Sequence, residues 1–66
     1  MQISINEEIK EVEAETTVAE LLIQLNMQPR YFAVERNCEL VPRAEYIRCV
    51  LQQGDRLEIV TLVGGG

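Results

Sequence analysis

Histidine and tryptophan are both absent from this 66-residue chain, and aromatic residues of any kind are few. Without histidine, no side chain titrates near neutral pH at its ordinary pKa, which excludes histidine-based acid–base catalysis. A serine or cysteine nucleophile activated by histidine is excluded for the same reason, and the commonest zinc ligand is missing. We therefore expect no metal site and no self-contained active site.

Glycine and cysteine are also scarce. Three of the four glycines are the last three residues, and Gly54 stands alone, so the chain has no glycine-rich phosphate-binding loop. Cys38 and Cys49 are too few for a disulfide framework, and their spacing matches no metal or redox motif. We expect reduced, partly buried thiols and a cytoplasmic protein.

Basic residues are few. Six basic residues against eleven acidic ones give a net charge of −5, and residues 1–20 carry this whole excess. Such a surface repels a phosphate backbone, so we expect no nucleic-acid partner, and no apolar run is long enough to span a membrane. The acidic stretch predicts either a solvated surface that aids solubility or a patch that steers a basic partner.

The length allows one small domain, and hydrophobic periodicity predicts its elements. Alternating apolar residues indicate strands, and the polar break after Asn6 makes the first two a hairpin. Gly54 and Asp55 indicate a tight turn before the last strand. The predicted strands cover residues 1–6, 9–14, 31–36 and 57–63, with a short extended piece at 40–41.

A helix is predicted after the hairpin. Thr17 and Glu20 form a capping-box pattern at its start, and Pro29 predicts its end near Asn26 or Met27. Its apolar residues share one face and have the spacing i, i+3, i+4, i+7: Val18, Leu21, Leu22 and Leu25.

These elements predict an α+β fold. The helix must cover one face of the sheet to bury its leucines, and placing the last strand beside the first makes the sheet mixed. Residues 43–51 are open to two interpretations: Ile47, Val50 and Leu51 either share one face of a short helix or lie under a loop.

The C-terminal glycines are the strongest functional signal. A tail without side chains is thin and flexible, and three residues reach about 10 Å. Its α-carboxylate has a pKa of about 3.5 and is therefore ionised at neutral pH. An ionised carboxylate can attack the α-phosphate of ATP to form an acyl-adenylate. In the strand before it, Val60 and Leu62 are predicted to face outward as a docking face; the alternative is that they pack under a loop or that the strand phase slips.

The whole chain resembles the ubiquitin-like sulfur carriers of thiamine biosynthesis, the ThiS family. The resemblance implies a β-grasp fold, with a domain at residues 1–63 and a flexible tail at residues 64–66. It rests on these segments: Met1–Asn6, Thr17–Leu22, Ala33–Asn37, Val41–Arg43, Gly54–Asp55 and the terminal Gly64, Gly65 and Gly66.

The resemblance also implies a mechanism in which the chain is a co-substrate and not an enzyme. A ubiquitin-activating-like adenylyltransferase uses ATP and magnesium, which the carrier itself does not bind, to adenylate Gly66. Sulfur that originates from cysteine, delivered through a cysteine desulfurase, converts the adenylate to a thiocarboxylate, which donates sulfur to thiazole synthase. Cys38 and Cys49 receive no role. Arg36 stands where the family often has an aliphatic residue, which predicts a frayed strand end.

Three other functions stay open at this stage. The chain could carry sulfur for another pathway, as the small subunit of molybdopterin synthase does, or it could be a ubiquitin-like protein modifier, because the activation chemistry is shared. An interaction domain with an unreactive tail is the alternative from a different class.

Overall fold

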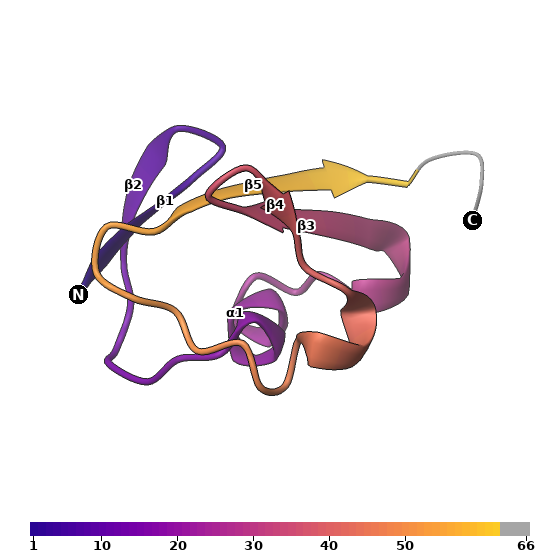
Figure 1. Cartoon of the computed structure of the whole chain (residues 1–66), viewed down its shortest axis with the longest axis horizontal. Helices are drawn as coiled ribbons and strands as arrows, with labels where there is room; N and C mark the ends of the chain where they lie inside the picture. The colour runs from indigo at the N-terminus through magenta and orange to yellow at the C-terminus, as the bar shows by residue number, and fades with distance from the viewer. Residues whose placement is uncertain (63–66) are drawn as a thin grey trace.

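The elements of the computed structural model, which describes residues 1–62, follow the predicted order (Figure 1). The helix α1 spans Val18–Gln24, and two 3₁₀ turns, η1 and η2, span Pro29–Tyr31 and Arg43–Glu45. The strands are β1 (Gln2–Ile5), β2 (Glu8–Glu11), β3 (Phe32–Arg36), β4 (Glu39–Leu40) and β5 (Arg56–Thr61).

The five strands form one mixed sheet in the order β2-β1-β5-β3-β4. The last strand, β5, lies in the centre, parallel to β1 and antiparallel to β3. Figure 1 shows α1 against one face of this sheet, and no other element of residues 1–62 covers the opposite face. The predicted α+β arrangement, with the last strand beside the first, is confirmed.

Two hairpins use the same kind of two-residue turn. Asn6 and Glu7 join β1 to β2, and Asn37 and Cys38 join β3 to β4, and all four residues have positive φ. Turns of this kind match the right-handed twist of the strands. Cys38 is consequently exposed, so the prediction of a partly buried thiol is wrong for Cys38, whereas Cys49 is half-buried; both are free.

The N-terminus of α1 has the predicted capping box. The Glu20 amide donates to the Thr17 hydroxyl at 3.1 Å, and the Thr17 amide donates to the Glu20 carboxylate at 3.0 Å. These two bonds satisfy amides that have no partner within the helix. The predicted apolar face is also correct: Val18, Leu21 and Leu22 are buried, and Leu25 packs against them.

The helix ends earlier than Pro29 suggested. It stops at Gln24, and Asn26 adopts a left-handed φ of 59°. The amide of Asn26 donates to the Ile23 carbonyl and the amide of Met27 to the Leu22 carbonyl, which is a Schellman ending. The predicted end near Asn26 or Met27 is therefore wrong because the asparagine stops the helix before the proline can.

The second strand is also shorter than predicted. It ends at Glu11 instead of Ala14, because the chain turns at Ala14 and Glu15, where Glu15 has a φ of 70°. The Thr16 hydroxyl closes this turn by donating to the Glu13 carbonyl at 2.7 Å. Val12 is still buried, whereas Ala14, at the turn, is exposed.

Residues 43–51 combine parts of both interpretations. A single 3₁₀ turn covers Arg43–Glu45, and of the three apolar residues considered only Leu51 is buried. Tyr46, which the pattern did not single out, is buried instead and donates to the Phe32 carbonyl. The core lies between α1, this segment and the sheet, and its most buried members are Ile3, Val18, Leu21, Leu22, Val34, Leu51 and Leu57.

We predict that Thr17→Ala lowers the free energy of unfolding by about 1 kcal/mol, because it leaves the Glu20 amide without its acceptor. The measurement is urea denaturation followed by circular dichroism. Thr17→Ser is the matched control and should retain most of the stability, since serine keeps the hydroxyl. Equal losses in the two variants would show that the cap contributes nothing.

Candidate functional site

The central strand β5 alternates between a buried and an exposed face. Leu57 and Ile59 point into the core, while Glu58, Val60 and Leu62 are exposed. Val60 retains 53% and Leu62 41% of its accessible surface. The predicted outward phase is therefore correct for Val60, and Leu62, directly after the strand, is also exposed; their role as a docking face stays a prediction.

Neighbouring strands extend this exposed surface. Val60 lies opposite Ala33 of β3, and Glu58 lies opposite Glu35. Glu35 lies in turn opposite Leu40 of β4, and Leu40 is also exposed. We call this surface the outer patch; it consists of Ala33, Glu35, Leu40, Glu58, Val60 and Leu62.

Asparagine side chains hold β5 at both of its edges. The Asn6 side chain accepts from the Ile59 amide at 2.8 Å and donates to the Ile59 carbonyl at 3.1 Å, which continues the pairing with β1 beyond the end of that strand. On the other edge, the Asn37 side chain accepts from the Arg56 amide at 3.0 Å. Both asparagines come from the hairpin turns, so these turns position the strand that carries Val60 and Leu62.

Asp55, immediately before β5, is the most buried charged residue of the described chain, at 5% exposure. Its carboxylate accepts from Arg36 Nε at 2.8 Å, from the Gln52 amide at 2.8 Å and from the Asn37 side chain at 3.1 Å. Arg36 itself lies opposite Leu57 in the β3–β5 ladder. The predicted fraying at Arg36 is therefore wrong, because a buried carboxylate pairs with the guanidinium and fastens the strand end.

The ionisation of Asp55 is coupled to this arrangement. Burial by itself would raise the pKa of Asp55, but the hydrogen bonds from Gln52, Asn37 and Arg36, together with the Arg36 charge, outweigh it and lower the pKa below its ordinary value. The bond to Asp55 also raises the pKa of Arg36. Asp55 is thus a structural anion that is charged in the folded protein.

The predicted reactive residue is at the end of this strand. Gly64, Gly65 and Gly66 lie outside the described residues, so the site at Gly66 and the tail boundary remain predictions. Leu62, the last described residue, donates its amide to the Tyr31 carbonyl at 2.8 Å, so the chain is still attached to the sheet at this point.

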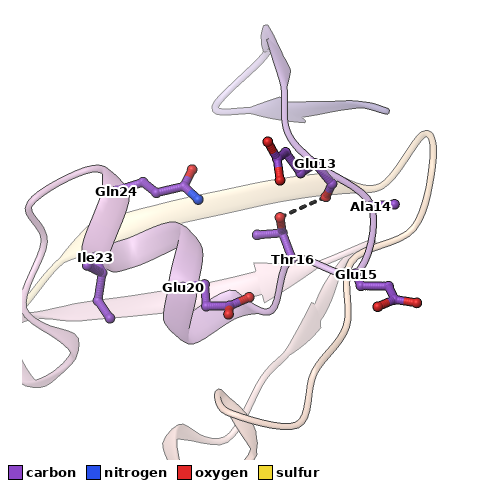
Figure 2. Close-up of a pocket in the computed structure, with 7 residues that line it drawn as sticks. All are labelled: Glu13, Ala14, Glu15, Thr16, Glu20, Ile23 and Gln24. Atoms are coloured by element: carbon purple, nitrogen blue, oxygen red, sulfur yellow. Dashed lines mark hydrogen bonds between the residues drawn. The ribbon is translucent and has the colours of Figure 1, made fainter.

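A second surface feature lies on the opposite side of the molecule, between α1 and the segment before it. Figure 2 shows this open hollow, where Glu13, Glu15 and Glu20 direct their carboxylates apart and do not converge. Glu20 is also committed to the helix cap. In residues 1–62 no three acidic or cysteine side chains are grouped so that they could hold a metal ion. The hollow therefore carries no chemistry that we can assign.

The described residues also contain no helix with the length and apolar character required to cross a bilayer.

Comparison of the fold with solved structures identifies the structural class of the chain. A crystal structure of the thiamine biosynthesis protein ThiS from Geobacter metallireducens superimposes with a TM-score of 0.86 at 30% identity, covering 100% of both chains. A solution structure of the thiamine biosynthesis protein from that organism superimposes with a TM-score of 0.79 over 88% of its length. The chain is thus a ubiquitin-like β-grasp domain, as the sequence predicted.

The family follows from sequence comparison. The sequence model of the ThiS family matches residues 2–66, and the sulfur carrier protein ThiS of Escherichia coli is 33% identical over the full length of both chains. The chain belongs to the ThiS family, which confirms the resemblance.

Two longer relatives are more similar in sequence. Proteins named thiazole synthase from Paramagnetospirillum magneticum and Magnetococcus marinus are each 44% identical over 66 residues. The chain spans only 20% of the length of either protein.

Sequence reasoning identified the outward residues of β5 but missed what positions them. Gly54 and Asp55 indicated only a turn, and Gly54 does have a positive φ, yet Asp55 also supplies the anion for Arg36. A usable signal was present: a cation at an inward strand position needs a buried partner, and Asp55 precedes the neighbouring strand.

We predict that the stability of the protein falls as the pH drops below about 4. Because the pKa of Asp55 is lower in the folded than in the unfolded state, its contribution is complete above the unfolded pKa and is lost as the pH falls through the folded pKa. The measurement is urea denaturation at a series of pH values from neutral down to acid.

Asp55→Asn is the matched variant. It should be about 2 kcal/mol less stable at neutral pH, because it removes the charge and places an amide where three donors meet. Its stability should then change less than that of the wild type on acidification. The assignment to Asp55 is wrong if both proteins lose the same stability between neutral and acid pH.

Proposed function

We propose that this chain is a sulfur carrier for thiamine biosynthesis, a protein co-substrate and not an enzyme. The observation that carries the proposal is the match over the full length of both chains to a relative named a sulfur carrier protein. The central strand β5 supports it, since this strand runs directly toward the terminal glycines and presents exposed apolar residues just before them.

The chemistry is carried by the α-carboxylate of Gly66. One carboxylate oxygen attacks the α-phosphorus of ATP and pyrophosphate leaves, which gives an acyl-adenylate on Gly66. Sulfur at the sulfide level, released from a persulfide by a thiol reductant, then attacks the carbonyl carbon; AMP leaves and Gly66 ends in a thiocarboxylate. ATP and magnesium belong to the partner adenylyltransferase, so the carrier itself needs no cofactor.

The proposal sets requirements on the tail. Gly66 must be the last residue of the mature chain, because a peptide bond after it would remove the carboxylate. Glycine is suited to this position since the absence of a Cβ keeps the approach to the carbonyl open. Residues 64–66 reach about 10 Å, enough to enter a narrow channel in a partner.

Three partners follow from the proposal. The adenylyltransferase activates Gly66, a cysteine desulfurase supplies sulfur indirectly, and thiazole synthase receives it. Thiazole synthase has the most support, because two relatives with that name contain a segment 44% identical to this chain. Two free cysteines suit a reducing compartment, so we place the carrier in the cytoplasm.

The outer patch is proposed as the docking face for these partners. Val60 and Leu62 are exposed on the strand that leads to Gly66, so a partner that covers them also holds the tail near its own active site. Such a partner gains apolar burial and orientation of the carboxylate in one binding event.

We predict that the chain forms a thiocarboxylate when incubated with its adenylyltransferase, ATP and a sulfur source. Intact-mass spectrometry should show the increase that corresponds to one oxygen replaced by sulfur. Deletion of Gly66, or addition of one residue after it, should abolish the increase and leave the circular dichroism spectrum unchanged. If the wild type stays unmodified beside a demonstrably active enzyme, the chain is an interaction domain with an unreactive tail.

We predict that Val60→Asp or Leu62→Asp weakens binding to the partner enzymes by at least about tenfold, because each places a charge in a covered apolar contact. Stability should change little, since both side chains are exposed in the free protein. Gln2→Asp adds the same charge to an exposed residue of β1 and serves as the control for calorimetric titration. Equal weakening by all three variants would refute the docking face.

A further inference from the structure

Two glutamates of the outer patch face each other across the sheet. Glu35 of β3 and Glu58 of β5 are direct partners in the antiparallel ladder. Both point to the outer face, because their neighbours Val34, Leu57 and Ile59 are buried. Directly opposite residues bring their Cβ atoms to within about 5 Å, and like charges in that position destabilise the sheet.

No ion pair of the described residues relieves this repulsion directly. Within residues 1–62 neither Glu35 nor Glu58 forms an ion pair. Arg36, the next residue along β3, is committed to Asp55. Arg56 lies on the same face of β5 but is opposite Ser4 of β1, and it pairs with neither glutamate.

Apolar side chains flank the two carboxylates. In the register of the sheet, Leu40 lies opposite Glu35 on one side, and Val60 follows Glu58 along the outer face of β5. Leu40 and Val60 are both more than half exposed, at 66% and 53%. An occupant that covers Leu40 and Val60 together therefore lies against Glu35 and Glu58.

The two carboxylates constrain the chemistry of any partner surface that binds the outer patch. A purely apolar partner surface would remove two like charges from water without compensation, which is strongly unfavourable. A cation placed between the two carboxylates attracts both of them and so removes their mutual repulsion. Covering the patch then becomes favourable. A guanidinium suits this position best, since its planar fork presents several N–H donors at once.

We infer that the Glu35–Glu58 pair receives an arginine side chain of thiazole synthase and determines the specificity of the outer patch. This inference rests on the proposed function, which names thiazole synthase as a partner. The arginine relieves the repulsion between the two carboxylates that the free carrier retains. The pair thus lowers the stability of the free protein slightly. It favours a complex with a partner surface that has a basic residue surrounded by apolar ones.

The test uses two substitutions whose effects on folding and on binding should have opposite signs. Glu35→Gln/Glu58→Gln removes the repulsion, and Glu58→Lys replaces it with an internal ion pair to Glu35. Both variants should melt at or above the temperature of the wild type. Both should bind purified thiazole synthase at least about tenfold more weakly in calorimetric titration.

The matched control is Glu13→Gln/Glu15→Gln, which removes the same number of charges at the turn before α1, on the opposite side of the molecule from the outer patch. It should change the affinity less than about twofold, because distant exposed charges are screened by salt. The affinity of the wild type should also fall more steeply with salt than that of Glu35→Gln/Glu58→Gln.

The outcomes distinguish the inferred arginine site from the proposed function. If the wild type binds thiazole synthase and Glu35→Gln/Glu58→Gln binds equally well, or no worse than the Glu13→Gln/Glu15→Gln control, the arginine site is wrong and the proposed function stands. If both patch variants melt well below the wild type, the pair is a structural feature and the inference is also overturned. If the wild type itself does not bind thiazole synthase, the proposed partner fails together with the inference.

Discussion

The ion pair between Arg36 and Asp55 is the interaction on which the rest of this structure depends. It ties the end of β3 to the residue immediately before β5, and the same carboxylate accepts from the loop before it and from the turn after β3. Because β5 is the central strand, its position decides whether the N-terminal hairpin and the C-terminal strands share one sheet. Two asparagines complete the arrangement by bonding to the backbone of β5 from either edge.

In residues 1–62 only one face of the sheet is covered by other elements. The helix and the segment around Tyr46 bury one face, while the other retains exposed Val60, Leu62 and Leu40 beside two opposed glutamates. A larger domain would cover such a surface with a second layer. Here the uncovered face includes β5, the last strand of the described residues, so the proposed docking face lies on the strand nearest in sequence to the terminal glycines.

Much of the architecture could be predicted because its signals are local. The capping box at Thr17 and Glu20, the apolar stripe of α1 and the alternation of β5 each depend on residues within a few positions of one another. The failures were also local: Asn26 ended the helix before Pro29, and Glu15 ended the second strand early, because single residues adopted left-handed conformations that their types only weakly favour. Arg36 was misjudged for a different reason, since its partner is nineteen positions away.

By itself, the sequence determined the order and faces of the elements, the family of the chain and the glycine end, because periodicity, capping and motif are properties of neighbouring residues. Only the tertiary structure decided that Asp55 is buried against Arg36, that Asn6 bonds to Ile59 at a separation of 53 residues, and that Glu35 stands opposite Glu58. These contacts depend on register between strands that are distant in the chain. Register is set by the packing of the whole core, which no single segment contains.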